Sequence, residues 1–70
     1  MKNNLQELRK EGKISQSDLA EQVGVTRQTI ISLEKGRYNA SLELAFKLSK
    51  YFHVGIEDIF VYEEEGLEND

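Results

Sequence analysis

The sequence predicts an all-α protein made of five short helices. Apolar residues recur at spacings of three and four through most of the chain, as they do along one face of a helix. No stretch alternates apolar and polar residues for long enough to form a sheet, and proline is absent. At 70 residues, the chain is long enough for one domain with a modest core and too short for a deep catalytic cavity.

Start and stop signals divide the chain into helices. The expected helices span roughly residues 3–11, 16–23, 26–35, 41–53 and 56–60. Leu5 and Leu8 share one face of the first helix, and Gly12 is predicted to end it as a left-handed cap. Ser15, followed three residues later by Asp18, forms a capping-box-like start for the second helix. The inner face of this second helix consists of Leu19, Ala20 and Val23.

The later helices carry equally clear boundary signals. Gly24 permits a positive φ where a sharp turn is needed, and Thr26 is a good N-cap for the third helix. Gly36 is expected to stop the third helix, Ser41 to open the fourth, and Gly55 to break the fourth. The predicted apolar stripe of the fourth helix consists of Leu42, Ala45, Leu48, Ser49 and Phe52.

The net charge of −4 is unevenly distributed along the chain. Residues 1–55 hold all nine Lys and Arg against six Asp and Glu, which gives this part a charge of +3. Residues 56–70 hold seven acids and no base, which gives −7. Charge judged by segment therefore leaves the body compatible with nucleic acid. We expect a domain over residues 1–62, followed by an acidic C-terminal tail over residues 63–70.

Composition argues against several classes of protein. Without cysteine the chain forms neither disulfides nor a zinc–thiolate site, which fits a cytoplasmic location. The start, "MKNNLQELRK", lacks the apolar stretch of a signal peptide, and no apolar run reaches the roughly 20 residues of a membrane span. His53 is the single histidine, and the acidic run at 63–65 is typical of a solubilising segment. We expect no metal, no cofactor, no membrane contact and no enzymatic activity.

The second and third helices have the form of a helix-turn-helix. They are joined by a short turn containing Gly24, and Ala20 is small where the helices cross. The inward residues of the third helix and its approach are Val25, Ile30 and Leu33. The outward residues are Arg27, Gln28, Ile31, Ser32 and Lys35. A helix fits the major groove of DNA, where Arg binds guanine and Gln binds adenine through paired hydrogen bonds. This pattern predicts that the third helix reads DNA.

The stretch "SQSDLAEQVGVTRQTIISLEKGRYNASLELAFKLSKYF" resembles the helix-turn-helix domains of the λ repressor and Cro type. The residues that carry the resemblance are Gln16, Ala20, Gly24, Val25, Ile30, Leu33, Glu34 and Gly36. It extends over roughly residues 3–60, nearly the whole chain. The resemblance implies a five-helix fold that binds operator DNA as a dimer and controls transcription, with repression as the expected effect.

The resemblance also implies roles for individual residues. The implied base contacts are Arg27, Gln28, Ser32 and Ile31, and the implied phosphate contacts are Gln16, Thr26, Lys35, Arg37, Tyr38 and Asn39. Ile31 is unusually apolar for a groove-facing position, and it either touches a thymine methyl or faces partly inward. Ala40 stands where the family commonly has proline. Glu34 is expected to orient Arg9 or Lys10 of the first helix.

A homodimer on palindromic DNA is the expected assembly, because one recognition helix contacts few base pairs. The residues expected at the dimer interface are Leu44, Tyr51, Phe60, Val61 and Tyr62. Leu44 and Tyr51 form a second stripe on the fourth helix, and core packing of Phe60 is the alternative. The rival interpretation is a protein-interaction module, such as the antitoxin of a toxin–antitoxin pair, which the acidic tail favours.

Overall fold

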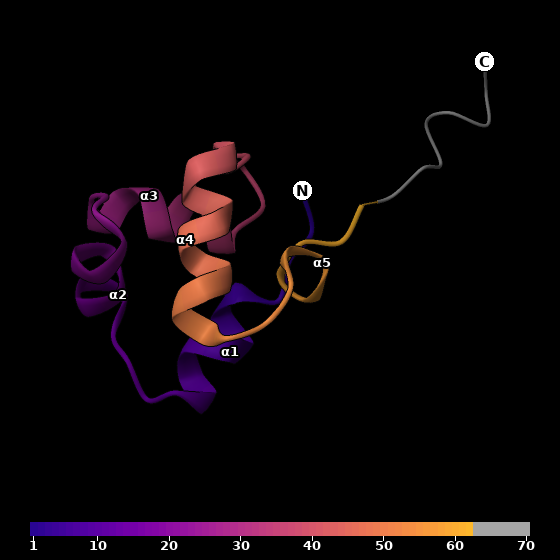
Figure 1. The fold of residues 1–70 in the computed structure, drawn as a ribbon. Helices are drawn as coiled ribbons and strands as arrows, with labels where there is room; N and C mark the ends of the chain where they lie inside the picture. Colours follow the sequence, from indigo (N-terminus) through magenta and orange to yellow (C-terminus); the bar gives the residue numbers. More distant parts are fainter. Residues whose placement is uncertain (63–70) are drawn as a thin grey trace, which may run out of the picture.

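Five α-helices make up the fold in the computed structural model, which describes residues 1–62, and they confirm the predicted all-α class. The helices are α1 (Leu5–Glu11), α2 (Gln16–Val23), α3 (Arg27–Glu34), α4 (Leu42–Phe52) and α5 (Ile56–Ile59). Figure 1 shows α4 crossing in front of α3, with α2 on one side and α5 on the other. The predicted acidic tail, residues 63–70, lies outside the described residues. None of the helices in the described part combines the length and apolar character that a membrane crossing needs.

Three helices begin at the serine or threonine that the sequence predicts. Ser15, Thr26 and Ser41 each have extended backbone, and the side-chain oxygen of each accepts a hydrogen bond from the backbone N–H three residues later. These bonds measure 3.0, 3.3 and 3.1 Å. Each bond satisfies one of the amides that the first turn of a helix leaves without an internal partner.

A residue in the left-handed conformation follows each of the first four helices. These residues are Lys13, Gly24, Gly36 and His53. In each case the amide of the next residue donates to a carbonyl five positions earlier, at 2.9–3.1 Å. This bond satisfies one of the last carbonyls of the helix. The positive φ predicted at Gly24 and the helix stop predicted at Gly36 are therefore confirmed.

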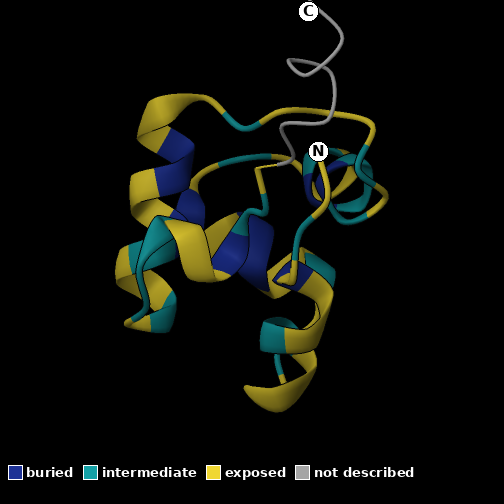
Figure 2. Cartoon of the chain, turned by 90° about the vertical axis from the view of Figure 1, so that its right-hand side faces the viewer, coloured by how far each residue is buried: buried dark blue, intermediate teal, exposed yellow. Residues whose placement is uncertain are grey.

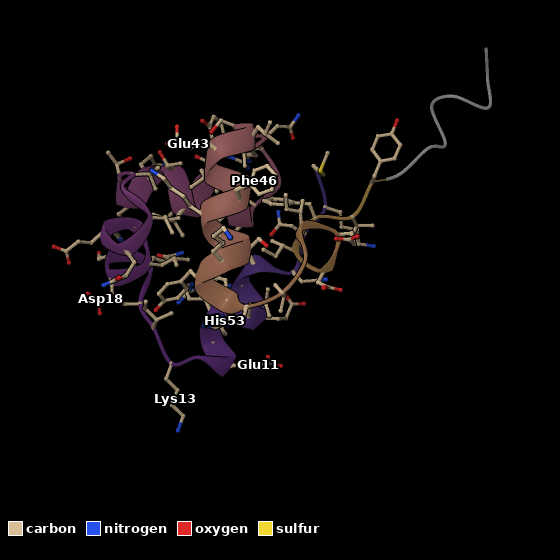
Figure 3. All side chains as sticks on the ribbon, viewed as in Figure 1. Glu11, Lys13, Asp18, Glu43, Phe46 and His53 are labelled. Atoms are coloured by element: carbon tan, nitrogen blue, oxygen red, sulfur yellow. The ribbon has the colours of Figure 1, made fainter. Side chains whose placement is uncertain are left out.

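The ends of α1 and α4 lie where the sequence predicts them, at Glu11 and next to His53, but the residues that turn the chain there differ from the prediction. Gly12 has φ −81° and continues the right-handed turn, while Lys13 takes the left-handed conformation with φ 57°. The bond from the Ile14 amide to the Arg9 carbonyl fixes this register, because the residue before Ile14 must reverse the chain. His53 ends α4 in the same way, and Gly55 precedes α5 instead. In Figure 3 the Lys13 side chain extends from the α1–α2 connection, away from the body.

The core draws residues from all five helices (Figure 2). Its members are Leu5, Leu19, Ala20, Val23, Ile30, Leu33, Leu44, Leu48 and Ile59. The predicted stripe of α4 is partly wrong, since Leu42 is 72% exposed and Leu44 is only 5% exposed. Both patterns have helical spacing. The face of α4 that carries Leu44 and Leu48 packs against α2 and the core. Leu42 and Phe46 therefore remain outside.

The segment before α1 is extended, whereas the sequence predicted a helix from residue 3. The Asn4 amide donates to the Ile59 carbonyl at 2.7 Å, and the Val61 amide donates to the Lys2 carbonyl at 2.8 Å. These bonds flank an antiparallel bridge between Asn3 and Phe60. The start of the chain therefore lies beside the residues that follow α5.

Candidate nucleic-acid interface

Helices α2 and α3 form the predicted helix-turn-helix. Gly24 has φ 74°, and the Val25 amide donates to the Ala20 carbonyl at 2.9 Å, which turns the chain sharply between the helices. Ala20 is 3% exposed, as expected for a small residue at a crossing, and Ile30 and Leu33 are fully buried. Val25 is partly buried against the core. The inward residues predicted for α3 are confirmed, and they fix which face of α3 points outward.

The predicted base contacts lie on the outward face of α3. Arg27 and Gln28 are exposed in its first turn, and Ser32 is half-buried one turn later. The Gln28 Nε2 atom donates to the Ser32 Oγ atom at 3.3 Å, so the two side chains lie together along the helix. Ile31 is half-buried, between the outward face and the core face.

An open hollow adjoins the N-terminal ends of α2 and α3. Its volume is about 540 Å³, and its lining residues are Arg9, Ser15, Gln16, Ser17 and Arg27. The Arg27 guanidinium and the positive end of the α2 dipole favour an anion there, whereas the Arg9 guanidinium is paired with the Glu34 carboxylate. Gln16 is the phosphate contact predicted at this place. The sequence analysis predicted no DNA role for Arg9 or Ser17. The position of Ser17 in the first turn of α2, next to Gln16, could have indicated that it lies near the phosphate backbone.

Glu34 joins α3 to both α1 and α2. Its carboxylate accepts from Arg9 Nε at 2.6 Å, from Arg9 Nη2 at 3.3 Å and from Gln16 Nε2 at 3.0 Å. The side chains of Arg9 and Glu34 are 12% and 5% exposed. Of the two partners predicted for Glu34, Arg9 is the one that pairs with it. The bond also orients Gln16, whose amide nitrogen has a second N–H that can donate to a phosphate.

The loop between α3 and α4 contains the remaining predicted phosphate contacts. Gly36 has φ 73°, and the Arg37 amide donates to the Ser32 carbonyl at 3.1 Å. This turn leaves Lys35, Arg37, Tyr38 and Asn39 exposed, as Thr26 is at the other end of the helix. Ala40, which replaces the usual proline, is partly buried against the core.

The residues predicted for a dimer interface do not share one environment. Leu44 is buried in the core, so its prediction as a surface residue is wrong. Tyr51 and Tyr62 are 37% and 65% exposed, while Phe60 and Val61 are half-buried. Phe60 packs against the core, which was the stated alternative.

Apolar side chains that the sequence placed elsewhere lie on the outer face of α4. Leu42 and Phe46 are 72% and 51% exposed, and Figure 3 shows Phe46 on this face. A groove of about 320 Å³ lies beside Leu42 and continues to Phe60. Its lining residues are Met1, Asn39, Ala40, Leu42, Ala45, Ile56 and Phe60.

Comparisons with known proteins agree on one family. Residues 5–59 match the sequence profile of the helix-turn-helix family. The chain is 55% identical over 65 residues to the uncharacterized HTH-type transcriptional regulator MJ0272 of Methanocaldococcus jannaschii, covering 93% of this chain and 98% of that protein. It is 52% identical over 66 residues to the uncharacterized HTH-type transcriptional regulator YgzD of Bacillus subtilis, covering 94% of this chain and all of that protein.

Solved structures show the same fold. The restriction-modification controller protein C.AhdI from Aeromonas hydrophila superposes with a TM-score of 0.73 and 32% sequence identity. The superposition covers 81% of this chain and 86% of that one. The overall fold of this chain is therefore similar to that of a known controller protein.

Proposed function

The chain belongs to the Cro/C1-type helix-turn-helix family of DNA-binding transcription regulators, and from this premise we propose that it represses transcription as a homodimer on a palindromic operator. It is a DNA-binding regulator and not an enzyme. In the proposal, α3 enters the major groove and α2 crosses the adjacent backbone, the usual arrangement for this motif.

The observation that carries the proposal is the position of Arg27 and Gln28. Both are exposed in the first turn of α3, the part of a recognition helix that reaches base edges. Arg27 binds guanine and Gln28 binds adenine through paired hydrogen bonds, with Ser32 as a third base contact. Ile31 is the candidate for contact with a thymine methyl.

The proposed phosphate contacts lie at both ends of α3, on either side of the base contacts. On one side, Gln16 and Thr26 bind the backbone at the N-terminal ends of α2 and α3, where the hollow described above favours an anion. On the other side, the exposed loop after α3 supplies Lys35, Arg37, Tyr38 and Asn39. These contacts fix the register of α3 on the duplex without reading sequence.

The proposed dimer interface lies on the apolar side that includes α4 and the residues after α5. It retains Phe60, Val61 and Tyr62 from the sequence prediction, and adds Leu42, which lines the same groove as Phe60, and the exposed Phe46. Tyr51 is left out of this surface, because it borders a separate hollow between α4 and α2. A second copy covers apolar surface that folding leaves exposed. Two copies related by a twofold axis also present two α3 helices to a palindrome. Bound in this way, the dimer represses by excluding other proteins from the same DNA.

The experiment begins with a duplex selected from random sequences by the wild-type protein. We expect Arg27→Ala to weaken binding to this duplex by about 1–3 kcal/mol and to relax the preference at one position. Arg37→Ala is expected to weaken binding to every duplex alike and to reduce the slope of log K against log salt by about one unit. If Arg27→Ala changes neither affinity nor preference, the assigned orientation of α3 is wrong.

Two controls separate the parts of the proposal. Lys50→Ala removes a charge in the last turn of α4, outside the helix-turn-helix, and is expected to leave affinity and salt dependence unchanged. Sedimentation tests the assembly. A monomer at tens of micromolar, both free and on DNA, excludes the dimer and leaves the roles of Arg27 and Arg37 standing. A promoter–reporter fusion that rises when the protein is removed supports repression, whereas one that falls indicates activation.

A further inference from the structure

Asn3 is a half-buried residue whose side chain contacts two helices. Its Nδ2 atom donates to the Leu33 carbonyl at 2.7 Å and to the Met1 carbonyl at 3.1 Å. Its Oδ1 atom accepts from the Leu5 amide at 3.1 Å. Leu33 lies in the last turn of α3, and its carbonyl also accepts a hydrogen bond from the Gly36 amide at 2.9 Å. The Asn3 side chain therefore binds the first amide of α1 and is a second donor to a carbonyl at the end of α3.

We propose that Asn3 is a positioning residue for DNA recognition, which fixes the direction of α3 by holding its C-terminal end against the start of α1. This inference rests on the DNA-binding role proposed for α3. Asn3 touches no DNA in this scheme. It acts through the backbone of Leu33, at the opposite end of α3 from the base-reading Arg27.

The last turn of α3 is attached to α1 at two separate points. The Leu33 carbonyl is bound by Asn3, which precedes α1, and the Glu34 carboxylate is bound by Arg9 in the last turn of α1. A single attachment would let α3 rotate relative to α1. Two attachments near opposite ends of α1 restrict the angle at which the two helices cross. The pair therefore sets how α3 crosses α1.

The backbone on either side of Asn3 is bonded to the residues at the end of α5. The Asn4 amide donates to the Ile59 carbonyl, and the Val61 amide donates to the Lys2 carbonyl. Asn3 is thus placed between α3 and the end of α5 and cannot follow a tilt of α3 without breaking these bonds. This arrangement makes the segment a rigid support.

A small tilt at one end of α3 matters at the other. Eight residues of α-helix span about 12 Å, so a rotation of about 5° about the C-terminal end moves the first turn by about 1 Å. Hydrogen bonds to bases lose most of their strength over such a displacement, whereas attraction to phosphates changes little. Loss of Asn3 is therefore expected to reduce sequence discrimination more than overall DNA binding.

The test compares Asn3→Asp and Asn3→Ala with Asn4→Ala in the full chain. Asn3→Asp keeps an acceptor for the Leu5 amide and removes the donor to Leu33, while Asn3→Ala removes both. Asn4→Ala is the matched control, because it removes a neighbouring asparagine whose Nδ2 donates to the Asp58 carbonyl at 3.1 Å and not to α3. Affinities for the selected duplex and for a scrambled duplex are measured at a temperature where every variant is folded.

We expect both Asn3 variants to lower the ratio of specific to non-specific affinity by at least about threefold, less than the loss of a full base contact. Asn4→Ala is expected to leave this ratio unchanged, even if it lowers the melting temperature. Amide hydrogen exchange gives a readout that needs no DNA. The amides of Gly36 and Arg37, which close the end of α3, are expected to exchange faster in the Asn3 variants than in Asn4→Ala.

The outcomes are distinguishable. If the wild-type protein does not discriminate between the duplexes, the proposed function fails and the positioning role falls with it. If the wild type discriminates and the Asn3 variants discriminate equally well, only the positioning role is refuted. Faster exchange together with unchanged discrimination also refutes it, because Asn3 then supports the helix end without directing α3.

Discussion

Replacing Glu34 by alanine is expected to destabilise the protein by about 3–5 kcal/mol, because it leaves the Arg9 guanidinium buried without its partner. The Glu34 carboxylate accepts three N–H groups, two from Arg9 and one from Gln16. With side-chain exposures of 12% and 5%, the Arg9–Glu34 pair gains little screening from water. A domain of 70 residues has a total stability of about 3.5–10 kcal/mol. The single substitution therefore removes a large part of it.

The assay is urea unfolding followed by circular dichroism, applied to a double-mutant cycle. Arg9→Ala, Glu34→Ala and the double variant are compared with the wild type. We expect the double variant to lose less stability than the two single losses combined, with a coupling energy of about 2–3 kcal/mol. The pair Arg9→Met with Glu34→Leu, which replaces both charges by apolar side chains, is expected to recover most of the stability.

The chain supplies its own control for this prediction. Glu43 and Lys47 form an exposed pair at 3.4 Å, with side chains 80% and 49% exposed. Glu43→Ala is expected to cost under about 1 kcal/mol, because exposed ion pairs and charges at a helix start contribute little. If Glu34→Ala costs no more than Glu43→Ala, or if the Arg9 and Glu34 losses are simply additive, the buried pair does not tie α1 to α3 in solution.

Three further predictions concern the turn at Lys13, the core face of α4 and the acidic residues 63–70. Lys13→Gly is expected to raise the unfolding free energy by about 0.5–1 kcal/mol, since Lys13 holds a positive φ that favours glycine, and a loss of stability would contradict the assignment of the left-handed turn. Leu44→Ala is expected to cost about 2–4 kcal/mol and Leu42→Ala under about 0.5 kcal/mol in the same assay, and equal costs would mean that α4 turns a different face to the core. Deletion of residues 63–70 is expected to change specific affinity by less than about threefold near 0.1 M salt, where the screening length is about 10 Å. A gain of tenfold at low salt that disappears as salt rises would show instead that the acidic residues compete with DNA.

Local signals in the sequence were sufficient for most helix boundaries. Ser15, Thr26 and Ser41 begin their helices through hydrogen bonds that reach only three residues along the chain. The turn at Gly24 likewise depends on a few neighbouring residues. Interactions of such short range leave a pattern of residue types that can be recognised without knowledge of the fold.

Features decided by distant contacts were not predictable in the same way. The bond from Asn3 to Leu33 joins residues thirty positions apart, and no local pattern marks an asparagine for that role. On α4, two overlapping stripes have helical spacing, and only packing against α2 decides that Leu44 is inside and Leu42 outside. At the end of α1, glycine preference favours residue 12, but the bond from the Ile14 amide places the left-handed turn at Lys13.

The candidate interface shows the same division, and it explains how a chain of net charge −4 can bind DNA. The exposed cations Arg27, Lys35 and Arg37 lie on α3 and directly after it, so the sequence alone could indicate them. Glu34 stands among them in the sequence, where it would repel phosphate. The fold removes that repulsion by burying the Glu34 carboxylate against Arg9, a residue 25 positions earlier. The same contact brings Arg9 to the hollow at the start of α2, beside the proposed phosphate contacts. The surface offered to DNA is therefore more basic than the sequence around α3 suggests, because its acidic residue is neutralised by a helix outside the helix-turn-helix.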